Sequence, residues 1–410
     1  MKLSYKKLDT YISFQNNLNE GMLVKDLLGI SNQKFFQKSH TNTIGIDLST
    51  YRVVRKNQFA FNRATTRNGD KISIALRQGD DCIVSPSYRV FKVIDESKLL
   101  SEYLLMWFKR PEFDRYARFK SHGSAHEFFE EDQMRGVELP IPSITKQREI
   151  VNEYNTINDR LDLSENLINA LEKVIYATYR QWFIDFEFPD SNKFSYKTNH
   201  GSMIYNEQLK TEIPVGWIVK RIGDLVACNN SSLSSNDGTK IISYLDTSSI
   251  TNNEIDDLQI FDISKDAIPS RAKRKVFHDD IIFSTVRPNL RHFGILKNPN
   301  KNLIVSTGFA VLTPIHKNIF SEFIYLFLTN NSMLERLQSK AEMSVSTYPS
   351  INADDLLDLY ICLPTEELLI NAEPIFRSLF EYCDFLKKEK KLLKNMRDLL
   401  FSRLATIEEH

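Results

Sequence analysis

Apolar residues recur at alternating steps of four and three along two long stretches of the chain. The first stretch carries this spacing at Ile150, Tyr154, Ile157, Leu161, Ser164, Ile168, Leu171 and Ile175. The second carries it at Ala372, Phe376, Leu379, Cys383, Leu386, Leu393, Met396 and Leu400, with Lys390 in one position. Such spacing, with polar residues elsewhere, predicts long helices that pair through one narrow stripe. We expect the two helices to pair with each other in antiparallel fashion; two separate core helices are the alternative.

Shorter segments ahead of each helix repeat in the same order about 220 residues apart. The first pair is an alternating strand that runs into an Arg-bearing loop, and the second is a strand, a turn and a second strand. The third pair is an apolar helix start, and the fourth is a strand-to-helix step. The four pairs are 57–67 with 279–291, 83–91 with 304–312, 101–108 with 321–328, and 139–151 with 361–373. Self-similarity at a fixed offset predicts a tandem duplication.

The duplication predicts an α/β fold with two similar globular domains separated by two long antiparallel helices that form a coiled coil. Because the strand-to-helix step closes each repeat, it sets the predicted boundaries. The first domain covers 1–144, a central helix 145–187, a linker 188–212, the second domain 213–364, and a C-terminal helix 365–410. We expect Pro189 to stop the central helix. Aromatic residues near its end either cover the junction with a domain or face another protein: Tyr179, Trp182, Phe183 and Phe186.

Composition and cysteine usage exclude several classes. No apolar run approaches the ~20 residues that a membrane span requires, and no signal-peptide core follows the N-terminal lysines. The four cysteines form no CxxC pair, so neither a zinc site nor a disulfide framework is indicated. These features favour a cytoplasmic protein.

Charge is balanced overall and uneven locally. The chain has 53 basic and 53 acidic residues. Residues 52–77 nevertheless hold seven Lys or Arg against one acid, and residues 267–300 hold seven against two. Two basic loop regions can bind a polyanion without making the whole protein basic, although solvated loops are the alternative.

Motifs for catalysis are missing. The chain has no P-loop, no GxGxxG, no methyltransferase motif that holds a flipped base, and no HExxH. Asp81, Glu96 and Lys98 could form a Mg²⁺-dependent nuclease core, but the second repeat has no counterpart. The polar side chains are concentrated instead in loops rich in Arg, Asn, Ser and Thr, which are the residue types that contact phosphates and base edges.

The segments "LLGISNQKFF", "YRVVRKNQFAFNRATTRNGDKISIAL", "IVSPSYRVF", "LPIPSITKQREIV", "YRQWFIDFEF" and "EIPVGWIVKRIGDL" occur in this order along the chain. With them the sequence resembles the specificity subunit of Type I restriction–modification systems over essentially its full length. The resemblance implies two target-recognition domains that each read half of a bipartite DNA sequence, and helices that act as a spacer. The short tail "ATIEEH" is a departure, because it leaves little room for a terminal extension.

The resemblance also implies partners. They are double-stranded DNA, two methyltransferase (modification) subunits and restriction/translocase subunits. The chain itself would be non-catalytic and would hold no cofactor or metal, whereas the partner subunits would use S-adenosylmethionine, ATP and Mg²⁺. A stand-alone Mg²⁺-dependent nuclease and a coiled-coil scaffold protein are the alternative functions.

Candidate DNA-contacting residues lie in two loops of each repeat. In the first repeat they are Arg63, Thr65, Thr66, Arg67, Asn68, Lys71, Ser121, His122 and Ser124. In the second they are Arg271, Lys273, Arg274, Arg287, Asn289, Arg291, Ser344, Ser346, Thr347 and Tyr348. Sequence alone does not separate base contacts from phosphate contacts among them.

Overall fold

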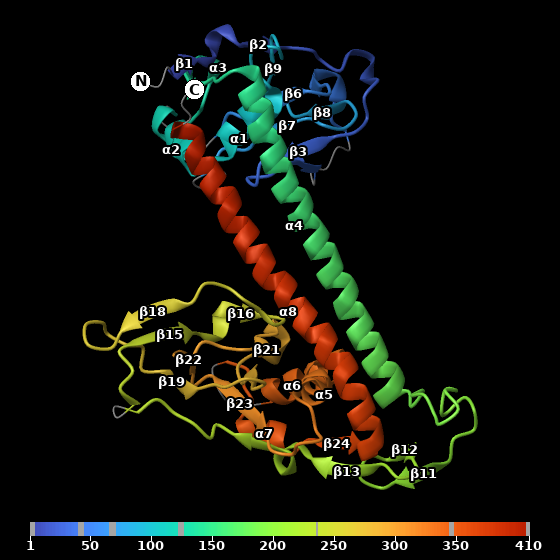
Figure 1. Ribbon diagram of the computed structural model, residues 1–410. Helices are drawn as coiled ribbons and strands as arrows, with labels where there is room; N and C mark the ends of the chain where they lie inside the picture. Colours follow the sequence, from blue (N-terminus) through green and yellow to red (C-terminus); the bar gives the residue numbers. More distant parts are fainter. Residues whose placement is uncertain are drawn as a thin grey trace. The chain divides into compact units, whose positions relative to one another are not determined.

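The computed structural model describes residues 5–39, 45–64, 71–121, 127–234, 237–343 and 348–406 (Figure 1). The chain divides into two compact units. The first unit comprises residues 1–163 and 391–410, and the second comprises residues 164–390. Each unit therefore contains one globular domain and part of each long helix. None of the helices in the described ranges is long and apolar enough to cross a membrane.

The first unit contains ten strands and three short α-helices among its described residues, and the helices lie between β9 and β10. The strands are β1 (Tyr5–Lys7), β2 (Ile12–Gln15), β3 (Leu28–Ile30), β4 (Phe36–Lys38), β5 (Arg52–Val54), β6 (Gln58–Asn62), β7 (Ile74–Leu76), β8 (Cys82–Val84), β9 (Tyr88–Val93) and β10 (Glu138–Pro140). The helices are α1 (Ser101–Lys109), α2 (Pro111–Lys120) and α3 (Glu131–Arg135).

The second unit has the same succession after a hairpin of its own. The hairpin is β11 (Met203–Asn206) and β12 (Thr211–Pro214). The strands that follow are β13 (Ile218–Arg221), β14 (Val226–Cys228), β15 (Ile241–Leu245), β16 (Ile250–Thr251), β17 (Glu254–Ile255), β18 (Gln259–Asp262), β19 (Ala272–Lys275), β20 (Ile281–Ser284), β21 (Phe293–Ile295), β22 (Leu303–Ser306), β23 (Phe309–Pro314) and β24 (Tyr360–Leu363). The helices are α5 (Ser321–Thr329), α6 (Asn331–Glu342) and α7 (Ala353–Leu357).

Strand order confirms the duplication. One four-stranded antiparallel sheet has the order β2-β9-β6-β7 in the first unit and β14-β23-β20-β21 in the second. A further antiparallel pair is β5 with β8 in the first unit and β19 with β22 in the second. The first strand of each repeat closes on the last, β1 on β10 and β13 on β24. The α/β fold expected from the sequence pattern is thus confirmed.

The central strands are buried on both faces because their side chains alternate between two cores. In β6, Phe59 and Phe61 face the main core of the first unit, whereas Ala60 lies in a smaller cluster. In β20, Ile281 and Phe283 likewise face the main core, and Ile282 lies on the other side. Helices α1 and α5 cover the main cores with apolar faces.

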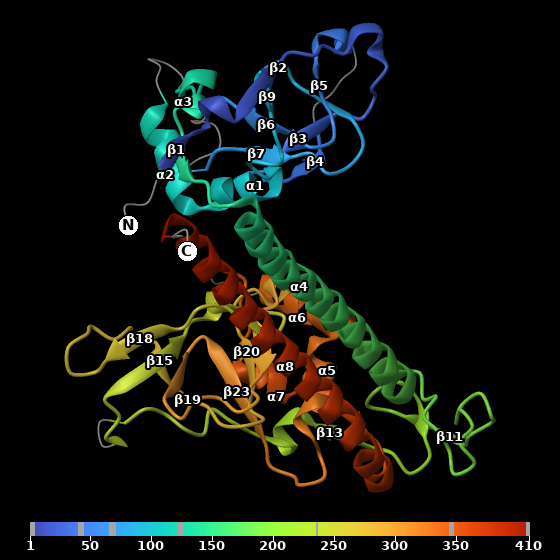
Figure 2. The same ribbon diagram turned by 45° about the horizontal axis from the view of Figure 1, so that its top comes forward.

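The two long helices are α4 (Ile144–Tyr179) and α8 (Glu366–Arg403), and they pair within each unit (Figure 2). In the first unit the ring of Tyr154 lies 5.5 Å from that of Phe401. In the second, Ser164 bonds to Glu389, and Tyr179 contacts Phe376 at 6.5 Å between ring centres. Rising numbers on α4 meet falling numbers on α8, so the helices are antiparallel, as expected.

The α4 stripe is buried as predicted apart from Leu171, which is half-buried, and the α8 stripe has one predicted position that is exposed. Lys390 is buried and bonds to Glu165 and Glu254, each at 2.7 Å. Burial alone would lower the pKa of Lys390, but the two carboxylates outweigh it and the pKa is raised. Met396, predicted in the stripe, is 53% exposed, so that prediction is wrong. Arg397 takes the place because the step from Leu393 is four residues, which keeps the 4-3 alternation.

The end of α4 turns into the core of the second unit. A π-helical turn, Arg180–Ile184, follows α4, and Phe186 then adopts a positive φ of 62°, so the helix ends before Pro189. Phe183 and Phe186 pack on Trp217, and these aromatic residues cover the domain junction. Residues 188–212, the predicted linker, include most of the β11–β12 hairpin, which ends at Pro214 within the predicted second domain.

Candidate nucleic-acid interface

The two predicted loops of each repeat meet through the same backbone junction. In the first unit, Ala64 forms a bridge with Phe128, and the Phe129 N–H donates to the Arg63 carbonyl at 2.8 Å. In the second unit, Val286 forms a bridge with Ser350, and the Ile351 N–H donates to the Thr285 carbonyl at 2.9 Å. Segments about 65 residues apart thus form one continuous edge in each repeat.

Several predicted contact residues lie outside the described residues. They are Thr65, Thr66, Arg67, Asn68, His122, Ser124, Ser344, Ser346 and Thr347. The geometry therefore concerns the described ends of these loops.

Arg63 in the first unit has two neighbours. Its guanidinium lies 4.8 Å from the centre of the Phe128 ring, and its Nη1 donates to Glu130 Oε1 at 2.9 Å. Glu130 is also 3.7 Å from Arg89. An acidic residue therefore lies beside the first-unit loops and holds two arginines. Glu130 was not among the residues predicted from the sequence, although it opens the run "EEDQ", which matches the helix-capping pattern at the start of α3.

The other two described candidates of the first unit differ in exposure. Lys71 is exposed at the end of its loop. Ser121 is buried, and its hydroxyl donates to the Ala117 carbonyl at 2.7 Å, one turn earlier in α2. The geometry gives Ser121 a local role at the end of α2.

Three second-unit candidates lie around the short turn η9 (Pro288–Leu290). Arg287 is exposed, and its guanidinium lies 5.1 Å from the centre of the Tyr348 ring. Asn289 is exposed, and its backbone N–H donates to Gln338 in α6 at 3.2 Å. Arg291 instead donates to Asn331 at 3.0 Å and lines a cavity of about 170 Å³ with Tyr176 and Lys387 of the long helices.

Arg271, Lys273 and Arg274 lie on or beside the edge strand β19. The Arg271 carbonyl accepts from Thr307, and Gly308 next to it accepts from Thr285 at the loop junction. Arg271 therefore lies at the end of β19 that is nearest to the loop junction at Thr285. Lys273 is exposed, whereas Arg274 is half-buried and its Nη1 has no hydrogen-bond partner among the described residues. Burial lowers the pKa of Arg274.

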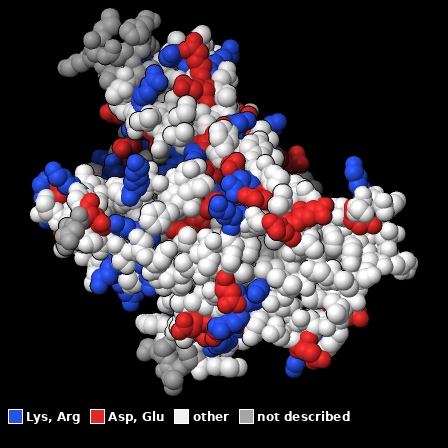
Figure 3. All heavy atoms as spheres, turned by 60° about the horizontal axis from the view of Figure 1, so that its bottom comes forward, with Lys and Arg blue, Asp and Glu red and all other residues white. Residues whose placement is uncertain are grey.

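Surface charge is mixed. Figure 3 shows a face on which Lys and Arg side chains lie close to Asp and Glu side chains. Basic and acidic groups are interspersed on this face, consistent with the balanced totals of 53 basic and 53 acidic residues.

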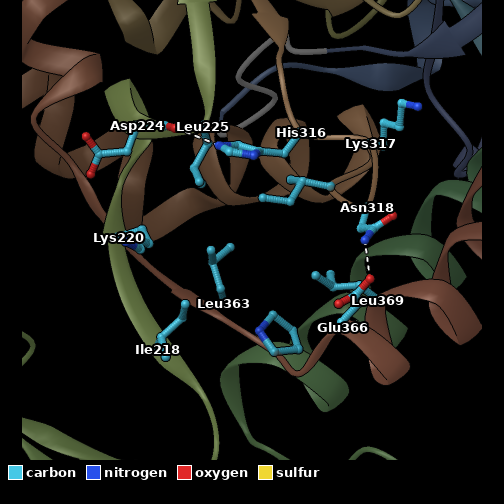
Figure 4. A pocket seen from close by; sticks show the side chains of 12 residues that line it. Ile218, Lys220, Asp224, Leu225, His316, Lys317, Asn318, Leu363, Glu366 and Leu369 are labelled. Carbon is cyan, nitrogen blue, oxygen red and sulfur yellow. Dashed lines mark hydrogen bonds between the residues drawn. The ribbon is translucent and has the colours of Figure 1, made fainter.

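A separate cavity of about 370 Å³ lies in the second unit between β13, β24 and the start of α8 (Figure 4). Its lining is mainly apolar, and His316 bonds to the Asp224 carbonyl at 3.0 Å. Leu369 lines it at the repeat position of Gln147. Gln147 is fully buried at the start of α4, where it accepts from Leu100 N at 2.9 Å and donates to two carbonyls. The cavity thus lies at the position where the second repeat has Leu369 in place of the hydrogen-bonded Gln147.

The hypothetical nuclease residues have structural contacts. Glu96 accepts from the backbone of Ser101 at 3.0 Å and caps α1, and Lys98 pairs with Asp95 at 3.3 Å. In the part of the chain that is described, no three His, Cys, Asp or Glu side chains gather closely enough to hold a metal ion.

Comparison with known proteins shows similarity to one family. Residues 214–395 match the Type I restriction modification DNA specificity domain. The MjaIX specificity subunit of Methanocaldococcus jannaschii is 27% identical over 322 residues, which is 76% of this chain and 70% of that one. The chain is similar to the specificity subunits of Type I restriction–modification systems. The HindI specificity subunit of Haemophilus influenzae is 27% identical over 158 residues, 38% of this chain and 34% of that one.

A solved structure agrees with the fold of this chain. The S subunit of a Type-I restriction-modification system from M. genitalium superposes with a TM-score of 0.60 at 15% identity, covering 99% of this chain and 96% of that one. At this identity the likeness concerns the fold alone. It includes the long helices and the mixed helix and strand architecture.

Proposed function

We propose that this chain is the non-catalytic specificity subunit of a Type I restriction–modification complex and binds a bipartite double-stranded DNA sequence. One unit would bind each half-site through its two joined loops. The observation that carries this proposal is the repeated junction, which presents an Arg over an aromatic ring in both units. The family match supports the same function.

Affinity and sequence choice would come from different contacts. Exposed cations such as Lys71 and Lys273 would bind phosphates, which supplies affinity that falls as salt rises. Arg and Asn side chains at the loop junctions would contact base edges. The paired helices α4 and α8 would set the length of the unspecific gap between the half-sites.

The partners would be two methyltransferase subunits and the restriction/translocase subunits, which bring S-adenosylmethionine, ATP and Mg²⁺. Exposed apolar side chains on α8 support a docking role for the long helices. In the second unit these include Tyr382 and Phe385, whose rings stack 6.4 Å apart and are exposed. Exposed aromatic residues on a helix that already buries its own stripe are typical of a surface that binds another protein.

The test is a binding titration of the chain with its methyltransferase on duplex DNA at several salt concentrations. We expect binding that weakens linearly on a log–log plot as salt rises. A scaffold protein would show no such DNA binding. Cleavage by the purified chain with Mg²⁺ alone, lost on Asp81→Ala, would support the nuclease instead.

A further inference from the structure

Both units place an arginine on an aromatic ring across the same loop junction, but the two arginines differ in what else they contact. Arg63 over Phe128 is also bonded to Glu130. Arg287 over Tyr348 has no ion-pair partner among the described residues, and both side chains are exposed. The second unit therefore displays a guanidinium whose N–H groups no carboxylate occupies.

The backbone that carries Arg287 is held at several points. The Arg287 N–H donates to the Pro349 carbonyl at 2.9 Å, and the Asn252 N–H donates to the Arg291 carbonyl at 2.9 Å. The Asn289 N–H donates to Gln338 of α6 at 3.2 Å, and Pro288 between them is buried. These contacts fix the turn to three separate elements of the unit.

The turn is also strained at both ends. Arg287 has a φ of 48° and Arg291 a φ of 57°, the left-handed region that residues with a β-carbon rarely adopt. Such a conformation costs free energy and persists only where surrounding contacts enforce it. The strain and its anchors point to a turn whose purpose is to present one side chain in a set direction.

The guanidinium of Arg is a planar fork whose two parallel N–H groups match the O6 and N7 acceptors of guanine in the major groove. Contact with the Tyr348 ring, at 5.1 Å from its centre, restricts where the guanidinium lies before DNA arrives, so less side-chain entropy remains to be lost on binding. We infer that Arg287 on Tyr348 reads a guanine in the half-site bound by the second unit, an assignment that rests on the proposed function.

The experiment uses the full chain with its methyltransferase subunits in a host, with methylated sites mapped by long-read sequencing. Arg287→Asn removes the guanidinium but suits a left-handed backbone, and Arg287→Lys keeps the charge without the fork. Tyr348→Phe keeps the ring, whereas Tyr348→Leu removes it. Lys265→Ala is the matched control, because Lys265 is an exposed cation of the same unit that pairs with Asp262 in the turn after β18.

We expect both Arg287 variants to relax the choice of one G·C pair in one half-site, lowering discrimination there by about 5- to 150-fold. The other half-site and the gap stay unchanged. Tyr348→Phe retains the choice and Tyr348→Leu weakens it, while Lys265→Ala maps to the wild-type sequence.

Full discrimination in Arg287→Lys would overturn the inference, because a point charge would then suffice. So would a uniform loss of methylation in Arg287→Asn with no change of base preference, or an affected half-site without a G·C pair. Failure of the proposed function is distinguishable, because the wild-type complex would then methylate no bipartite sequence at all.

Discussion

A buried charged cluster in the second unit allows a quantitative test of how the recognition fold is held together. Lys297, which follows β21, donates from Nζ to Glu322 Oε1 at 2.6 Å and also bonds to Asp279. The Glu322 side chain at the start of α5 is 0% exposed, and that of Lys297 is 4% exposed. Lys297→Met removes the only cation that is paired with Glu322 among the described residues.

The expected loss follows from this burial. Removing one member of a buried pair leaves an uncompensated charge and costs about 3–5 kcal/mol, whereas an exposed pair contributes about 0–1 kcal/mol. Glu322 Oε2 has no hydrogen-bond partner among the described residues, so no second donor is in place to compensate. We therefore expect Lys297→Met to destabilise the second unit by about 3–5 kcal/mol. Adding Glu322→Gln should recover most of the loss, because it removes the stranded charge.

Urea unfolding followed by tryptophan fluorescence measures this effect. In a Trp107→Phe background the remaining tryptophans, Trp182 and Trp217, both lie in the second unit. Lys34→Met is the matched control, because Lys34 forms a buried pair with Asp114 in the first unit at 2.7 Å. A loss below about 1 kcal/mol for Lys297→Met, or a double variant no more stable than the single one, would refute the reasoning.

Three further predictions concern the loops and the helices. Glu130→Gln releases Arg63 and should strengthen DNA binding of the complex about 1.5- to 5-fold at low salt, the worth of an exposed pair; unchanged or weaker binding in the titration contradicts this. Deleting four residues within 158–170 should change the gap in the methylated sequence by about two base pairs, because each helical residue spans ~1.5 Å, and altered half-sites would contradict the division of roles. Since the pKa of Lys390 is raised by its carboxylates, its stabilising contribution is present below pH 10.5 and lost as pH rises through the raised value. Above pH 7, where Glu165 and Glu254 stay ionised, the stability difference between wild type and Lys390→Met in urea should therefore change only above about pH 10, and a change between pH 7 and 9 would contradict the assignment.

The long helices and the duplication could be predicted because both leave periodic patterns in the sequence. Apolar residues at steps of four and three located the α4 stripe, from Ile150 to Ile175, in which Leu171 alone is half-buried rather than buried. Met396 was misplaced because Met396 and Arg397 both follow Leu393 within one turn, and only packing decides between them. Lys390 is a charged residue in the apolar stripe of α8. It can be buried there because it pairs with Glu165 and Glu254, which are distant in sequence.

The candidate site was harder to predict because side-chain direction depends on tertiary contacts. The pairing of the two loops in each unit follows from the repeat, but Ser121 is buried against α2 and Arg291 contacts Asn331. Both have the residue types of a DNA contact, and neither presents that group openly. The left-handed turn at Arg287 likewise depends on anchors in α6 and at Pro349 that no local pattern records.

In the proposed function, this chain alone determines which two-part DNA sequence its complex binds. Long-read mapping of methylated sites in a host with the complete system, before and after deletion of this gene, tests it most directly. The account predicts methylation at one bipartite sequence that disappears with the gene and returns when the gene is restored. Methylation that is unchanged after deletion, or that depends on the gene at a single continuous sequence, would contradict it.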